Sequence, residues 1–346
     1  MPTSSTHLRT TVRYLQLVLF GGIILYLGHT LFVPLFLGLL IAIVLYPSCK
    51  WLEGKGIPKS IAIGMCLLLV GLLLAALIGL LVWELGAFRE DAPEVMMKLK
   101  GIWLQVQAWA RQRFGEDVLA HFNWLQKLAD NLGSIFQSTI TATANMLFVF
   151  FLVPVYSALF LYHRKAFVRA LIMAVPEEHH EGLHTILNQT IHTYHRYIKG
   201  MVWVYLIVGV LNALGLWALG VEHAFMFGML CAIMTIIPYA GIIVSALLPI
   251  SVVWLSTGSI WYPIGVIAIF GVVQYLEANV IFPRVVGEQL NVSTWATLVA
   301  IIAGGVVWGV SGMILFVPFV AILKIVSDHV GGWKSLNILL SREWMK

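Results

Sequence analysis

Residues 223–276 read HAFMFGMLCAIMTIIPYAGIIVSALLPISVVWLSTGSIWYPIGVIAIFGVVQYL, without a single Asp, Glu, Lys or Arg. As one α-helix this run would be about 80 Å long at 1.5 Å per residue. The hydrocarbon core of a bilayer is only about 30 Å thick, so the run must fold back at least once. Proline removes a backbone donor and clashes with the preceding turn, which makes Pro238, Pro249 and Pro263 the expected break points.

Charged residues are rare in the rest of the chain too. The sequence is 60% hydrophobic and 11% charged, against about 25% charged residues in a soluble domain. This composition excludes most water-soluble classes and disordered chains. The net charge of +5 is small for 346 residues, and nucleic-acid binding needs a concentrated basic face, so no nucleic-acid partner is expected. The expected surroundings are a lipid bilayer.

The gaps between charges predict the membrane spans, and helix is the expected element because lipid offers backbone groups no other partner. We expect an all-α, polytopic integral membrane protein with about eight transmembrane or re-entrant helices, some of them broken in the C-terminal half. The stretch from Tyr14 to Cys49 is read as two crossings with a tight turn near His29, or alternatively as one long bent helix. The expected spans are 15–29, 33–49, 60–83, 138–162, 200–221, 224–248, 259–282 and 294–324.

Lysine and arginine in short loops orient the chain, because cytoplasmic loops carry an excess of both. Basic residues precede the first helix, follow Cys49, outnumber Glu between 164 and 199, and close the chain. Both termini are therefore expected in the cytoplasm of a multi-pass protein. The expected parts are the N-terminal helices at 1–83, an extracytoplasmic amphipathic segment at 84–137, the fourth helix at 138–162, a cytoplasmic His-rich helical loop at 163–199, a transport core at 200–325 and a cytoplasmic tail at 326–346.

Histidines gather in the 163–199 loop, where pairs three or four residues apart can share a helix face. A metal or pH-sensing site is one interpretation. A solvated interfacial helix is favoured, since no Cys joins the histidines and the motif His-Glu-x-x-His is absent; no metal site and no cofactor are expected. The histidines are His163, His179, His180, His184, His192 and His195.

Glycines repeat at helical spacing in two predicted spans, which indicates faces for close helix packing. In the third span they recur every seven or eight residues, and in the last they include a small-xxx-small step. A glycine face also permits sliding, which a transporter could use. The packing glycines are Gly64, Gly71, Gly79, Gly305, Gly309 and Gly312.

The predicted substrate or ion pathway combines a broken helix with polar side chains in the next span. Pro238, Tyr239 and Gly241 interrupt a helix at mid-membrane, where exposed backbone groups are tolerated only beside protein or a polar cavity. A membrane carboxylate is costly, so Glu277 is a candidate to bind a cation or a proton. Alternatively, it lies at the membrane edge, solvated or paired with Arg284. Its polar companions on the same stretch are Gln274, Asn279, Pro283 and Arg284.

The order of these motifs resembles the autoinducer-2 exporter family of bacterial membrane proteins, over nearly the whole chain. One departure is Ala240, where the family usually has Val or Ile. The pieces that carry the resemblance are Gly56-Ile57-Pro58-Lys59, Pro154 to Arg164, Ile237-Pro238-Tyr239-Ala240-Gly241, Gln274-x-x-Glu277-x-Asn279-x-x-x-Pro283, and Gly305, Gly309, Gly312 and Pro318.

The resemblance implies an inner-membrane transporter and a homo-oligomer, with a pentamer among the implied forms. It links some members to export of the signal autoinducer-2 and others to sodium- or lithium-for-proton exchange. No serine-hydrolase elbow or ATP-binding loop is present, so an enzyme is not expected. The predicted function is a secondary transporter that exports a small molecule; a cation/proton antiporter and a non-transporting membrane scaffold are the alternatives.

Overall fold

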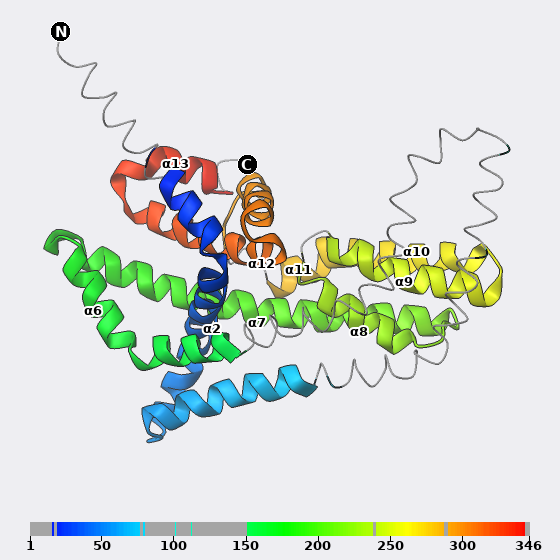
Figure 1. The fold of residues 1–346 in the computed structure, drawn as a ribbon, viewed down its shortest axis with the longest axis horizontal. Helices are drawn as coiled ribbons and strands as arrows, with labels where there is room; N and C mark the ends of the chain where they lie inside the picture. The colour runs from blue at the N-terminus through cyan, green and yellow to red at the C-terminus, as the bar shows by residue number, and fades with distance from the viewer. Residues whose placement is uncertain are drawn as a thin grey trace, which may run out of the picture. The chain divides into compact units, whose positions relative to one another are not determined.

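The computed structural model describes residues 19–76, 151–237, 240–286 and 290–342, together with the isolated positions 16, 79, 101 and 112. These residues are almost entirely helical (Figure 1), and within them the only β-type pairing is an isolated bridge between Val292 and Ser341. The all-α prediction is therefore confirmed. The helices are α2 (His29–Gly54), Lys59–Ala76, Phe151–Tyr162, α6 (Arg164–Ala174), α7 (His180–Ala218), α8 (Ala224–Met234), α9 (Ala240–Thr257), α10 (Trp261–Leu276), α11 (Phe282–Val285), α12 (Thr294–His329) and α13 (Lys334–Leu340).

Five of these elements are long and apolar enough to cross a membrane, which supports the polytopic membrane fold. Large apolar side chains on them are exposed, as expected where lipid is the solvent. Three further apolar helices, Phe151–Tyr162, Ala224–Met234 and Gly241–Trp254, are shorter. The five long elements are His29–Gly54, Lys59–Ala76, Glu177–Ala218, Trp261–Val285 and Thr294–His329.

The chain divides into two compact units, and the expected transport core at 200–325 stays a prediction. Unit 1 holds Met1–Leu67, Leu152–Lys199 and Glu288–Lys346, and unit 2 holds Leu68–Phe151 and Gly200–Gly287. The expected extracytoplasmic segment at 84–137, and most of the expected span at 138–162, lie outside the described residues.

The N-terminal stretch forms one helix with a local break, as in the bent-helix alternative. Helix precedes Gly28, whose ψ of 15° departs from helical geometry, and α2 follows it. Hydrogen bonds continue on both sides, from Gly28 N to Ile24 O at 2.8 Å and from Phe32 N to Gly28 O at 2.9 Å. The expected tight turn near His29 is therefore wrong, because glycine here bends the helix without reversing it.

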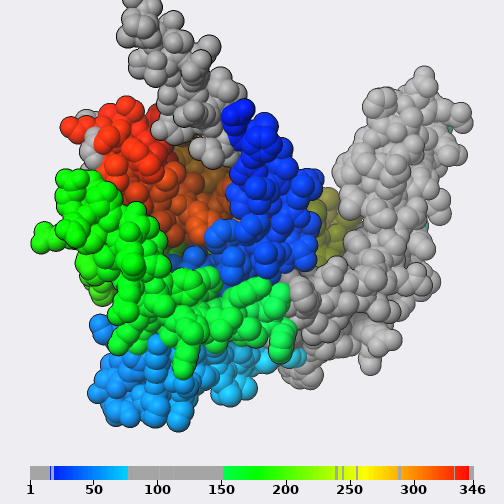
Figure 2. Space-filling view, turned by 60° about the vertical axis from the view of Figure 1, so that its left-hand side comes forward, coloured from blue at the N-terminus to red at the C-terminus, as the bar shows by residue number. Residues whose placement is uncertain are grey.

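Unit 1 brings together three stretches that are far apart in sequence, coloured blue, green and orange to red in Figure 2. Ser157 donates a hydrogen bond to the Gly38 carbonyl at 2.9 Å. A Cβ at Gly38 would lie 2.6 Å from the Tyr156 Cβ, so glycine is needed for this close approach. Buried side chains in two clusters complete the packing: Ala42, Cys49, Ile63, Cys66 and Leu161 in one, and Leu40, Tyr194 and Ala321 in the other.

Helix α12 is not the single continuous crossing expected over 294–324. Its backbone leaves helical geometry at Trp308 and Gly309, and Gly309 has φ 59° and ψ −140°, a conformation essentially restricted to glycine. A Cβ at Gly312 would overlap the Gly304 carbonyl oxygen, so the second arm folds back against the first. The sequence pattern assigned these glycines to a packing face. In the structure they also allow α12 to form a helical hairpin.

Candidate functional site

The long charge-free run folds as a second hairpin, made by α8 and α9 in unit 2. Helix α8 ends at Met234, and α9 begins at Ala240. The expected break in the segment of Pro238–Gly241 is therefore present, although Pro238 and Tyr239 themselves lie outside the described residues. With 11 residues, α8 is about 16 Å long and too short to cross a bilayer.

Gly241 allows the two arms of this hairpin to meet. A Cβ at this position would overlap the carbonyl oxygen of Met234, so only glycine fits here without a shift of the backbone. Helix α9 then packs against α8 on one side and α10 on the other (Figure 1). Pro249 lies inside α9, and Pro263 lies in the first turn of α10, where proline is well tolerated.

Small residues let α8 approach α7 closely. A Cβ at Gly209 of α7 would lie 2.7 Å from Ala232 Cβ, and one at Gly228 of α8 would lie 2.5 Å from Ala213 Cβ. Each helix therefore contributes two small residues four positions apart, the arrangement typical of tight helix contacts in membranes. The sequence reasoning missed this contact, which fixes the polar residues next to it.

Polar atoms gather where α7, α8 and α9 pack. The amide of Asn212 donates to the Val208 carbonyl at 3.0 Å and to Cys231 Sγ at 3.4 Å. Asn212 is 1% exposed, yet its Oδ1 atom has no hydrogen-bond partner. The side chains of Ser245 and Thr235 lie near the Cys231 thiol, and the Thr235 hydroxyl donates to the Cys231 carbonyl at 2.7 Å. A buried polar atom without a partner is costly, which is what makes Asn212 a candidate to contact a ligand.

Glu277 extends this polar cluster from the end of α10. Its carboxylate lies within electrostatic range of Cys231 and near the side chain of Gln274. Its second oxygen, Oε2, is buried without a partner. Glu277 also begins the π-helical turn η2 (Glu277–Ile281), which widens the helix at this point. Such π-turns occur frequently at functional sites.

The other predicted pathway residues lie differently. Asn279 is exposed, and its side chain donates to the Tyr275 carbonyl at 2.9 Å. Pro283 and Arg284 are exposed as well. Within the described residues Glu277 makes no ion pair with Arg284, which leaves the pairing alternative without support. The structure therefore brings Gln274 and Glu277 together and adds Asn212, Cys231, Thr235 and Ser245.

Sequence reasoning could have found part of this set. Asn212 is a lone amide in the predicted span 200–221, the same signal that singled out Gln274 and Glu277. Cys231 and Ser245 gave no such signal, because isolated thiols and hydroxyls are common in membrane helices and bond to their own backbone. Ser245 does so here, to the Ile242 carbonyl at 3.0 Å.

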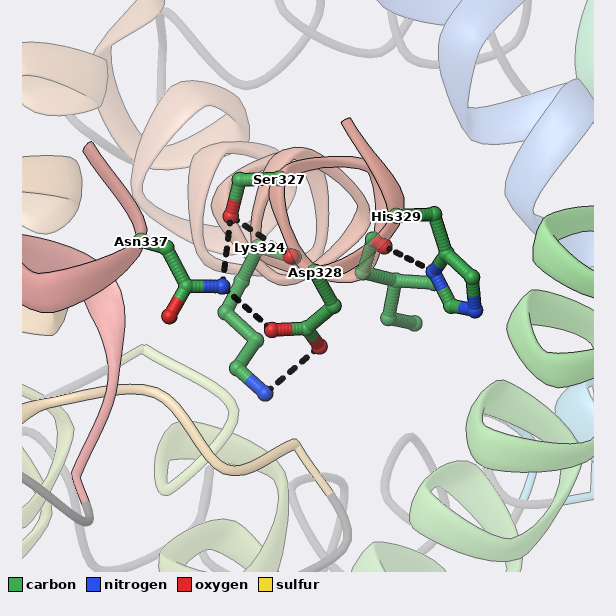
Figure 3. A network of polar contacts seen from close by, with 6 residues as sticks. Lys324, Ser327, Asp328, His329 and Asn337 are labelled. Carbon is green, nitrogen blue, oxygen red and sulfur yellow. Dashed lines mark hydrogen bonds and ion pairs between the residues drawn. The ribbon is translucent and has the colours of Figure 1, made fainter. Parts of the chain in front are cut away.

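Unit 1 holds a buried ionisable group that is paired. Lys324 of α12 is 7% exposed, and its Nζ lies 2.7 Å from an Asp328 carboxylate oxygen. Asn337 of α13 donates to Asp328 and, at 3.4 Å, to Ser327 (Figure 3). The sequence placed Lys324 at the end of the last expected span, among the basic residues that close the chain. In the structure it is buried in an ion pair within α12, and the Asn337 bonds hold α13 against this pair.

The histidines of 163–199 do not converge. His180 and His195 each interact with a backbone carbonyl, those of Val175 and Val44. Among the described residues no group of three or more His, Cys, Asp or Glu could hold a metal ion.

The packing glycines of the third span point away from the rest of the described structure. A Cβ at Gly64, Gly71 or Gly79 would meet no atom within 4 Å. A packing partner for this face would have to come from outside the described residues, so its role stays a prediction.

Comparison with known proteins identifies the family of this chain. A family model described as "AI-2E family transporter" matches residues 15–332, most of the chain. The chain belongs to the AI-2E transporter family. The resemblance seen in the sequence is thereby confirmed, and the multi-pass membrane fold agrees with it.

Relatives in this family cover nearly the whole chain. "Putative transport protein YrrI" of Bacillus subtilis (strain 168) is 26% identical over 311 residues, which is 87% of this chain and 86% of the relative. "Putative transport protein YhhT" of Escherichia coli (strain K12) is 27% identical over 320 residues, covering 89% and 87%. "AI-2 transport protein TqsA" of the same strain is 26% identical over 324 residues, covering 89% of each chain.

Proposed function

We propose that this AI-2E family member is a secondary transporter that exports a small, sugar-like molecule of the autoinducer-2 kind. The observation that carries the proposal is the polar cluster of unit 2, in which buried Asn212 Oδ1 and Glu277 Oε2 have no partner. The relative named AI-2 transport protein supports the substrate class. Hydroxyl groups of such a substrate would donate to these two free oxygens.

The hairpin geometry supports alternating access as the mechanism. Transport sites near the bilayer midplane are commonly formed by discontinuous helices, and α8 and α9 are interrupted beside the polar cluster. In the proposed cycle the α8/α9 hairpin moves to open the cluster to one side of the membrane and then to the other. Glu277 carries the proton or cation that couples the two states.

Sodium- or lithium-for-proton exchange is the second candidate. Glu277 supplies a carboxylate that no basic residue neutralises within the described part of the chain, and hard cations prefer oxygen ligands such as carboxylates, amides and hydroxyls. In this version the cation itself occupies the cluster. A membrane scaffold that binds partners through the segment at 84–130 is the remaining alternative.

Flux into proteoliposomes separates these candidates. The purified protein is reconstituted, and uptake of autoinducer-2, sodium and lithium is measured for the wild type, Glu277→Gln and the exposed control Glu181→Gln. We expect Glu277→Gln to reduce flux at least ten-fold at unchanged thermal stability, and Glu181→Gln to leave it intact. Wild-type flux in Glu277→Gln would contradict the coupling role, and no flux of any substrate would favour the scaffold.

The proposal includes a bacterial inner-membrane location, cytoplasmic termini and a homo-oligomer. The ion pair between Glu53 and Arg164 supports one element of this topology, because it holds residues on either side of the 59–162 stretch at the same membrane face. Reporter fusions after Lys100 and after Glu181 should report opposite sides of the membrane. A common side for both would overturn the proposed orientation.

A further inference from the structure

Five basic residues gather where α2 ends and α6 begins in unit 1. One carboxylate, Glu53, lies in the same stretches, 50–59 and 162–165, so the local formal charge is five minus one, or +4. Both stretches belong to one unit and are tied together by the ion pair between Arg164 and Glu53. This basic cluster consists of Lys50, Lys55, Lys59, Arg164 and Lys165.

The cluster keeps hydrogen-bond donors that the protein does not use. Arg164 bonds Glu53 through Nη2, while its Nη1 is buried without a partner. Lys59 donates one hydrogen bond to the Tyr162 carbonyl, and its ammonium group has three N–H donors in all. Glu53 Oε1 is also unpartnered, and Lys59 and Lys165 are within electrostatic range of this carboxylate. One carboxylate cannot satisfy this many cations.

Two aromatic rings make cation–π contacts with lysines of the basic cluster. Lys55 Nζ lies 3.6 Å from the centroid of the Trp51 ring, and Lys59 Nζ lies 4.9 Å from that of Tyr162. Both rings are exposed. Trp and Tyr with this exposure are typical of the headgroup region of a membrane, and Lys or Arg beside them meets lipid phosphates.

Exposed apolar side chains continue from the cluster along both neighbouring helices. Ile61 and Met65 are 54% and 49% exposed on the helix that begins at Lys59. Val155 and Leu159 are 38% and 47% exposed on the helix that ends at Tyr162. The surface thus combines a cationic end with an adjoining apolar face, which matches a charged headgroup and its acyl chains.

We propose that the basic cluster binds the headgroup of an anionic glycerophospholipid. The phosphate lies against Lys59 and the exposed Lys165, and the acyl chains follow the apolar rows of the two helices. A soluble phosphate would use the cations but not the exposed apolar side chains, so the lipid is the occupant that accounts for both. This site is separate from the polar cluster of unit 2, and the inference does not depend on the substrate.

Lipid retention by the full-length purified protein tests the site. Binding of phosphatidylglycerol and phosphatidylcholine is titrated in detergent by native mass spectrometry for the wild type and for the double variant Lys59→Gln/Lys165→Gln. Each surface cation contributes about five-fold to anionic lipid affinity, so we expect the double variant to bind phosphatidylglycerol about 25-fold more weakly. Arg164 is left intact because it pairs with Glu53.

The exposed Lys334→Gln variant removes one positive charge outside the cluster and should retain wild-type affinity. Thermal unfolding of each variant confirms that the fold is kept. Equal binding of the two lipids by the wild type, or a full phosphatidylglycerol preference in the double variant, would overturn the proposal. Inorganic phosphate forms a further arm: if it displaces phosphatidylglycerol at matched concentration, the cluster is a soluble-anion site and the lipid assignment is wrong.

Discussion

The two units each fold an apolar segment back on itself, but they line the two hairpins with different chemistry. The α12 hairpin of unit 1 lies among aromatic rings: Trp308 contacts Phe36 and Phe316, with ring centroids 5.8 Å and 5.5 Å away. The α8/α9 hairpin of unit 2 lies beside the amide of Asn212 and the carboxylate of Glu277. The same backbone device therefore appears once in an apolar setting and once in a polar one.

The buried charges differ in the same way. In unit 1, Lys324 is neutralised by Asp328, which Asn337 also holds. In unit 2, Glu277 has one oxygen without a partner. A fully satisfied network stabilises a fold, whereas an unsatisfied polar group is a cost that a bound ligand can remove. The hairpin alone does not distinguish a structural element from a candidate site; the unsatisfied atoms do.

The largest expected effect concerns the glycines that let the two arms of each hairpin meet. Gly241→Ala and Gly312→Ala each place a Cβ against backbone, of Met234 and Gly304 respectively, and should destabilise the protein by about 3 kcal/mol. Thermal unfolding in detergent measures the loss. Gly71→Ala is the matched control, since a Cβ there meets open space within the described residues, and it should stay within about 0.5 kcal/mol of the wild type. A wild-type unfolding temperature for Gly312→Ala would show that the arms of α12 do not meet.

The second prediction concerns the paired charge of unit 1. Asp328→Ala leaves Lys324 without its partner, and because Asp328 is partly exposed we expect a loss of about 2 kcal/mol. The double variant Lys324→Met/Asp328→Leu should recover most of it, because no uncompensated charge remains. Thermal unfolding of both variants checks this. Equal destabilisation of the single and double variants would show that the uncompensated charge of Lys324 is not the cause of the loss.

The third prediction concerns the unpaired atoms of unit 2. Asn212→Leu removes a buried amide whose oxygen has no partner, so we expect an increase in stability of about 1 kcal/mol. The same change should lower flux about ten-fold, because stabilised sites commonly lose function. Unfolding temperature and proteoliposome flux are measured on the same preparation. A destabilised variant with full flux would place Asn212 in the packing and outside the pathway.

The smallest expected effect concerns a single hydrogen bond. Trp308 donates from its indole Nε1 to the Leu25 carbonyl at 2.9 Å. Trp308→Phe keeps an aromatic ring but loses this bond, so we expect a destabilisation of about 1 kcal/mol and unchanged flux. Leu25→Ala retains the carbonyl and serves as the control for the bond itself. If Trp308→Phe abolishes flux at full stability, the apolar hairpin takes part in transport and the contrast between the hairpins fails.

The membrane fold could be predicted from the spacing of charges, because a bilayer penalises them strongly enough to leave long gaps. The break before Gly241 could be predicted as well, since Pro238 and Gly241 stand three apart in an otherwise uniform apolar run. Glu277 was conspicuous for the same energetic reason. Its choice as a site residue remains a prediction, as do Pro238 and Tyr239.

The remaining features depend on contacts between distant segments. A glycine that packs, such as Gly38, and a glycine that reverses a helix, such as Gly309, look alike in sequence. The break at Gly28 bends a helix in which a full turn was expected. Lys324 was counted among the basic residues that close the chain, whereas the structure buries it beside Asp328. Tertiary packing determines each of these features, and it cannot be inferred from the local sequence pattern.

The bond from Trp308 to Leu25 joins residues 283 positions apart. Unit 1 is built from three stretches, the last of which begins at Glu288, so it cannot close until residues beyond 287 have been translated. Unit 2 ends at Gly287, so it can close before the last stretch of unit 1 is made. The helix that contains Leu25 must therefore wait for Trp308 to be synthesised, and unit 2 can assemble before unit 1 is complete.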